Sequence, residues 1–162
     1  MKRHVAWVIS ALVLIAAAGA GVGAWLLARG HGSPLPQISA YSRGTTVRVE
    51  PYLYCNVVNL NECAKSGAQG ELSVATRYPV QLSVPPAISH APWRLLRIYE
   101  DEGEITTAYR PGTQQAVTIP TVDAQRGRII GVVVQLLTLV RDQAGELHDV
   151  PHAEWSLRLV WN

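Results

Sequence analysis

Hydrophobic and polar residues alternate with a period of two along much of the chain after residue 43. The alternation is clear in ELSVAT (residues 71–76) and PVQLSV (79–84), and in the C-terminal segment 155–161, where Trp and Leu occupy every second position. Similar short segments rich in β-branched or aromatic residues occur at WRLLRIYE, ITTAY and QAVTIP. Successive side chains of a strand point to opposite faces, so this pattern predicts β-strands with one buried face.

One apolar segment, RIIGVVVQLLTLVR (128–141), departs from this alternation. Its apolar run of 12 residues is too short to span a bilayer, and Val and Ile dominate its first half. We therefore expect a central strand that is buried on both faces, with a bulge at Gly131. No stretch after residue 44 predicts an amphipathic helix, and turn signals that contain Gly separate the segments.

About eight short strands in one domain, residues 43–162, predict an all-β fold. We expect a β-sandwich of immunoglobulin-like or fibronectin-like type, and a partly open barrel is the alternative. The chain has no Phe, so the large rings of the core must come from its 5 Trp and 6 Tyr residues. The polar tips of those rings then need hydrogen-bond partners.

The N-terminal segment has a different pattern. Residues 5–28 carry no charge, and an apolar helix of about 20 residues spans a membrane. Lys2 and Arg3 precede this segment, so residues 1–4 are expected in the cytoplasm and the rest of the chain outside the plasma membrane. A cleaved signal peptide is the alternative, because Ala18-Gly19-Ala20 offers small residues for cleavage. The apolar run continues well beyond that point, which favours a retained anchor.

Two further features bear on the predicted anchor. Gly19 and Gly23 lie four residues apart, a spacing that lets two membrane helices approach closely. It predicts a homodimer or a membrane-protein partner, although Gly also simply fills an apolar segment. Residues 29–42 are rich in Gly, Pro and Ser and are expected to form an irregular tether between the anchor and the β domain.

The charge balance excludes two classes of partner. The chain has 14 Lys and Arg against 12 Asp and Glu, and removing Lys2 and Arg3 leaves 12 of each sign. A neutral exported part has no basic surface for nucleic acid and no strong field for anionic lipid head groups. We therefore expect no nucleic-acid partner, and the membrane contact is that of a single-pass anchor.

Both cysteines of the chain, Cys55 and Cys63, lie in one short segment. A structural zinc site needs four ligands, and no CxxC pair or nearby downstream His supplies them. A catalytic thiol needs a base and would tend to oxidise outside the cell. We therefore expect a disulfide, which stabilises the fold by about 2.5 kcal/mol on the chain-entropy account. Its loop contains Asn56, Asn59 and Asn61, which favour a turn and present a possible partner surface.

Other candidate sites are weaker. His148 and His152 have the spacing of a metal pair on a helix, but Pro151 opposes a helix, so an exposed loop before the last strand is expected. The acidic residues of segment 100–104 lack the spacing of a calcium loop, and Gly103 fits an ordinary hairpin. No nucleophile elbow or phosphate-binding glycine loop is present. We expect no metal, no cofactor and no enzymatic activity.

Trp93 is the remaining candidate. It follows three prolines, Pro85, Pro86 and Pro92, and begins a predicted strand. We expect it either to pack in the core between two sheets or to line an aromatic groove for a partner or a lipid-like ligand.

Three patterns occur together in this chain. They are Val-Glu-Pro followed by Tyr-Cys and a second Cys (49–63), the segment LSVPPAISHAPWRLLRIYE (82–100), and one N-terminal apolar segment before a β domain. Together they resemble an uncharacterised family of small, membrane-anchored exported proteins of mycobacteria and related actinobacteria. The resemblance implies a location in the cell envelope, and it brings no catalytic residues because the function of that family is not established.

These observations lead to an expected function. We expect a non-enzymatic binding or accessory domain that is tethered to the plasma membrane and belongs to an envelope or transporter complex. A carrier of an apolar envelope ligand, such as a lipid, is the alternative.

Overall fold

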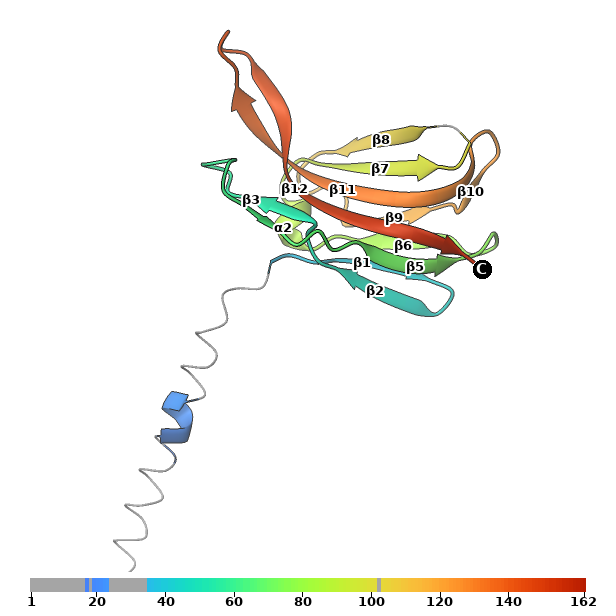
Figure 1. Cartoon of the computed structure of the whole chain (residues 1–162), viewed down its shortest axis with the longest axis horizontal. Helices are drawn as coiled ribbons and strands as arrows, with labels where there is room; N and C mark the ends of the chain where they lie inside the picture. Colours follow the sequence, from blue (N-terminus) through green and yellow to red (C-terminus); the bar gives the residue numbers. More distant parts are fainter. Residues whose placement is uncertain (1–16, 18, 24–34, 102) are drawn as a thin grey trace, which may run out of the picture. The chain divides into compact units, whose positions relative to one another are not determined.

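The computed structural model describes residues 17, 19–23, 35–101 and 103–162, and its compact β unit runs from Leu35 to Asn162. Within these residues the β unit contains twelve strands and one short helix (Figure 1). In chain order the elements are β1 (Ile38–Ser42), β2 (Thr45–Val49), β3 (Leu53–Cys55), β4 (Cys63–Lys65), β5 (Gly70–Val74), β6 (Val80–Ser83), α2 (Pro86–Ser89), β7 (Trp93–Tyr99), β8 (Glu104–Tyr109), β9 (Ala116–Ile119), β10 (Val122–Asp123), β11 (Gly127–Arg141) and β12 (Leu147–Trp161).

The strands form two sheets. The smaller sheet has the order β2-β1-β6-β9, and the larger one has the order β4-β3-β12-β11-β7-β8, with β5 and β10 pairing outside that path. Neighbouring strands are antiparallel except for β5, which runs parallel to β12. The predicted all-β class is therefore confirmed.

The core combines residues of both sheets. Ile38 of β1 and Leu82 of β6 pack with Trp93, Trp155 and Leu157 of the larger sheet, and each of these five is at most 1% exposed. From Ala153 to Leu159 burial alternates along β12, as the sequence of this part predicts, because every second side chain points toward the smaller sheet. The hydrophobic pattern thus sets which face of each long strand is buried.

The polar tips of two tryptophans find backbone partners, whereas the buried Nε1 of Trp93 has none among the described residues. The Nε1–H group of Trp155 donates to the carbonyl oxygen of Pro36 at 2.8 Å. The corresponding group of Trp161 donates to the carbonyl oxygen of Ile129 at 2.9 Å. The first bond ties the entry of the chain into the β unit to the central strand β12.

The predicted tether extends too far along the chain, because its last residues form a strand. Residues 29–42 were expected to be irregular, but β1 occupies Ile38–Ser42 within that range and forms the middle of the smaller sheet. Ile38 and Ala40 are buried while Tyr41 is exposed. The five residues of β1 thus alternate in burial, although the segment around them is rich in Gly and Pro. The β domain therefore begins near Leu35, and residues 29–34 lie outside the described residues.

β11 is only partly as expected. Its inner face, with Val132, Val134 and Leu136, is fully buried, but Val133 and Gln135 on the other face are half-buried. The strand thus covers the core with one face, because among the described strands none lies on the outer side of the larger sheet. The predicted bulge is present, since the register with β7 shifts between Ile129 and Gly131.

Most of the predicted anchor, residues 5–28, lies outside the described residues. Within the described part of that range, Ala17 and residues 19–23 are helical. Gly19 and Gly23 belong to this piece, and their role in helix packing stays a prediction. Among the residues that the structure describes, every helix is too short or too polar to cross a bilayer.

Candidate functional site

The best-defined candidate site is the loop between β3 and β4, residues 56–62, which we call the disulfide loop. β3 ends at Cys55 and β4 begins at Cys63, and the two cysteines are direct partners in the antiparallel pairing of these strands. A disulfide joins them, which confirms the sequence prediction. Their Cα atoms are 3.9 Å apart, so the two ends of the loop are held together at its base.

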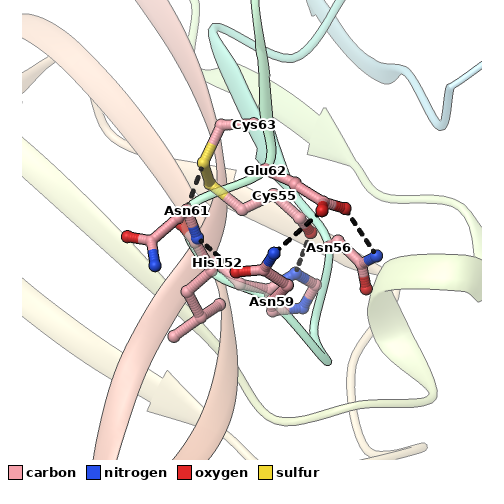
Figure 2. Close-up of a disulfide and its surroundings, with 8 residues drawn as sticks. Cys55, Asn56, Asn59, Asn61, Glu62, Cys63 and His152 are labelled. Atoms are coloured by element: carbon pink, nitrogen blue, oxygen red, sulfur yellow. Dashed lines mark hydrogen bonds between the residues drawn. A yellow bond between two sulfur atoms is a disulfide. The ribbon is translucent and has the colours of Figure 1, made fainter.

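Hydrogen bonds within the disulfide loop define its conformation (Figure 2). The side-chain amides of Asn56 and Asn59 donate to the two carboxylate oxygens of Glu62, at 3.4 and 2.8 Å. The side-chain oxygens of the same asparagines accept backbone N–H groups, from Val58 at 3.0 Å and from Asn61 at 3.3 Å. Asparagine favours turns through such bonds to the backbone two residues on. Asn56 and Asn59 therefore shape the loop from within.

The side chains that the disulfide loop exposes most are apolar. Val57 is 56% exposed and Val58 is 91% exposed. The hydrogen-bonded backbone keeps both valines in water rather than against the domain. The sequence prediction selected Asn56, Asn59 and Asn61 as the surface and missed the valines, although a Val-Val pair between turn-forming residues was the available signal.

The base of the disulfide loop rests on β12. His152 is 6% exposed, and its Nδ1 atom lies 3.3 Å from the backbone oxygen of Cys55 (Figure 2). The ring of Tyr54 packs against it edge-on, with 6.0 Å between the ring centroids. His152 lies at a bulge, where the register of β12 with β11 shifts between Leu136 and Leu137. Since bulges redirect side chains, the bulge accounts for the position of His152 beneath the loop.

The exposed loop predicted around His148 and His152 is wrong, because both residues lie in β12. Pro151 is tolerated there because it sits beside the bulge, where a missing N–H group disrupts little. The two histidines are also in different surroundings, since His152 is buried and His148 is exposed near the β11–β12 turn.

His148 instead groups with two carboxylates at the tip of the β11–β12 hairpin. The possible ligand atoms of Asp142, Glu146 and His148 all lie within 4.8 Å of one another. His148 Nε2 is 3.0 Å from Asp142 Oδ2, and this hydrogen bond, with the backbone N–H of Glu146, lowers the pKa of Asp142. All three side chains are exposed, and two hydrogen bonds to the Asp142 carboxylate, from the His148 ring and from the backbone N–H of Glu146, account for the grouping. Sequence reasoning missed it because the turn at Gly145 folds Asp142 and Glu146 back beside His148 of β12.

Trp93 lies in the core, so the first of its two expected positions is the observed one. It is 0% exposed, and its ring stacks on that of Tyr109 with 4.3 Å between centroids. Burial raises the pKa of Tyr109, and the positive charge of Arg97 offsets part of that effect. Trp93 therefore supports the larger sheet and forms no part of the surface.

Glu100, Asp101 and Gly103 lie in the turn of the β7–β8 hairpin, as predicted, and Glu104 begins β8. The backbone N–H of Tyr99 donates to the carbonyl oxygen of Gly103 at 3.1 Å, and Gly103 has a positive φ of 45°. Asp101 donates its N–H to the carbonyl oxygen of Arg126 at 3.3 Å, and its carboxylate packs against Gly127. These contacts give Asp101 a structural role at the joint between two turns.

Fold and site together define a class of protein, an all-β domain of two sheets with a loop closed by a disulfide. The chain belongs to the family described as "Protein of unknown function (DUF2771)", whose model matches residues 31–160. Uncharacterised proteins of Mycobacterium tuberculosis and Mycobacterium bovis are 63% identical over 162 residues, which cover 99% of this chain and 100% of theirs. The resemblance to an uncharacterised family with mycobacterial members is thereby confirmed. No solved structure matches the chain.

Proposed function

We propose that this protein is a non-enzymatic binding or accessory protein of the cell envelope. Residues 5–28 tether it to the plasma membrane, the β domain lies outside the cell, and the fold is a sandwich of the immunoglobulin-like type. The disulfide loop contacts a membrane protein of an envelope or transporter complex. The observation that carries this proposal is Val58, which is 91% exposed at the tip of a loop closed by a disulfide.

The energetics of the disulfide loop support a binding function. Full burial of one valine side chain contributes roughly 1.5–3 kcal/mol, so a partner that covers Val57 and Val58 gains a useful part of its affinity from them. A loop that is already ordered by its disulfide and by Asn56 and Asn59 loses little entropy when it binds. The valines and the hydrogen bonds thus serve one purpose, the rigid presentation of a small apolar contact.

Two other observations support the proposal. Disulfides persist in oxidising compartments, so the Cys55–Cys63 bond is in keeping with export. The space between the sheets, which a lipid carrier would need, is filled by side chains such as Trp93 and Trp155, both 0% exposed. A binding surface on the outside therefore fits the structure better than a carrier cavity between the sheets.

Crosslinking in native membranes tests this function. A photoreactive amino acid at position 58 of the full chain is expected to trap a membrane protein, and the same group at exposed Thr106 on β8 is the control. Replacing Val57 by serine in the crosslinking chain should reduce the yield at position 58. Equal products at positions 58 and 106 would contradict the proposal. A product that contains only a second copy of this chain would replace the membrane partner with a homodimer.

A further inference from the structure

A hollow of about 410 Å³ lies beside the β1–β2 turn, and we call it the turn hollow. Its lining residues are Tyr41, Arg43, Gly44, Tyr78, Pro79 and Gln81. In Figure 1 the β1–β2 turn lies at the opposite end of the β unit from the disulfide loop. The volume is within the range of small-ligand pockets, and the turn hollow is distinct from the surface assigned to the proposed partner.

Arg43, in the turn beside the turn hollow, has a backbone conformation that is unusual for an arginine. Ser42 pairs with Thr45, so the β1–β2 turn consists of Arg43 and Gly44 alone, with φ angles of 50° and 80°. Two-residue turns with positive φ at both positions favour Asn, Asp or Gly in the first place. Among the described residues Arg43 is the one residue other than Gly with a positive φ. A long side chain in this unfavourable conformation suggests a role for the guanidinium group.

The guanidinium group of Arg43 has no anionic partner within the described part of the chain. It takes part in none of the ion pairs there, and no Asp or Glu lines the turn hollow. Its Cζ atom lies 6.0 Å from the centre of the Tyr78 ring, at the outer limit of a cation–π contact. The turn hollow therefore offers a positive charge beside exposed aromatic rings.

The other side chains of the turn hollow come from hydrogen-bonded backbone. Tyr41 of β1 is the direct partner of Gln81 in β6. The backbone N–H of Tyr78 donates to the carbonyl oxygen of Ala75 at 3.2 Å, and the buried hydroxyl of Ser42 donates to the carbonyl oxygen of Tyr78 at 3.4 Å. Two strands and one hydrogen-bonded turn thus fix the backbone from which the lining side chains project.

We propose that the turn hollow binds a hydroxylated ring that carries a carboxylate, such as a uronic acid unit of a polysaccharide. A guanidinium group binds a carboxylate through two parallel hydrogen bonds. The faces of Tyr41 and Tyr78 contact the apolar C–H face of the ring, and the phenol and amide groups bond to its hydroxyls. A shallow hollow with mixed polar and apolar walls suits such a ligand better than a lipid chain, which needs an enclosed apolar cavity.

Titration of the full chain in detergent micelles with glucuronate, followed by NMR, tests this site. Glucuronate is expected to bind saturably, and both glucose, which lacks the carboxylate, and inorganic phosphate, which lacks the ring, should bind at least tenfold more weakly. Arg43→Asn should lower the affinity for glucuronate at least tenfold. The matched control Arg48→Asn, which removes one charge from the same hairpin outside the turn hollow, should leave it unchanged.

A second measurement separates binding from a structural role. Asn suits the first position of this turn better than Arg, so Arg43→Asn should raise Tm by roughly 1–4 °C while binding is lost. A fall in Tm with unchanged affinity would show that Arg43 is structural and would overturn the proposal. Absence of saturable glucuronate binding would overturn it too, and equal binding of phosphate would refute the requirement for a ring. Tyr78→Ser tests the ring contact separately and should also weaken glucuronate binding.

Discussion

Replacing both Cys55 and Cys63 by serine should lower the free energy of unfolding by about 2.5 kcal/mol. The two cysteines are 8 residues apart, and a crosslink over a loop of that length removes roughly 8 cal/mol/K of entropy from the unfolded chain. The native loop should change little, because the β3–β4 pairing and the bonds from Asn56 and Asn59 to Glu62 do not involve sulfur. The loss therefore arises in the unfolded state.

Urea titration followed by tryptophan fluorescence measures this change, since Trp93 and Trp155 are both in the core. For the β unit Leu35–Asn162, unfolding entropy of roughly 2.1 cal/mol/K per residue converts the loss into a fall in Tm of about 9 °C. Reductant should shift the parent chain by the same amount and leave the double variant unchanged. A loss below about 1 kcal/mol would refute the chain-entropy reasoning for this loop. A loss well above about 4 kcal/mol would mean that the disulfide also holds native contacts of β3.

Three further predictions concern single side chains. Val58→Ser should keep the free energy of unfolding within about 0.5 kcal/mol of the parent in urea titrations, because the valine is 91% exposed; a larger loss would show that Val58 packs against the domain. Trp155→Phe removes the 2.8 Å hydrogen bond to Pro36 and should lower the free energy of unfolding by about 1–2 kcal/mol in the same titration. An unchanged free energy of unfolding would show that this bond contributes nothing to stability. The Asp142 carboxyl should titrate below its ordinary pKa of 3.8 in NMR, and His148→Ala should move the midpoint upward. Because the pKa is lowered in the folded state, the pair stabilises the hairpin above the ordinary pKa and that contribution is lost as pH falls through the folded value; an unchanged midpoint in the variant would contradict this.

Several strands of the fold could be predicted because their side chains alternate between core and solvent. The period-two pattern located β5, β6 and the end of β12, whose inner positions are Trp155, Leu157 and Leu159. It missed β1, because the composition around Ile38 is that of a tether. It also missed β3 and β4, since three residues are too few to show a period. The pairing of β5 with β12 brings residues about 87 positions apart side by side, as Gln69 and Ser156 show, and no local pattern contains it.

Of the candidate sites, only the features that follow from residue type alone could be predicted from the sequence. Two cysteines and a proposed oxidising compartment were enough to predict the disulfide. The orientation of Val58 depends on the hydrogen-bond partners of the Asn56 and Asn59 side chains. Those partners are set by the three-dimensional shape of the loop and cannot be read from residue types. Likewise, the turn hollow exists only because β6 brings Gln81 beside Tyr41, and no local sequence pattern contains that pairing.

The place of β12 in the larger sheet has a consequence for how the chain folds. This strand is the last in sequence, and it pairs with β11 on one edge and with β3 and β5 on the other. β3 and β4 therefore remain detached from β7, β8 and β11 until residues 147–161 are available. Pairings of such wide sequence separation form slowly. Before then a nascent chain can form two separate parts of this sheet, the β3–β4 hairpin and the three strands β8, β7 and β11, and β12 must emerge before the two parts join.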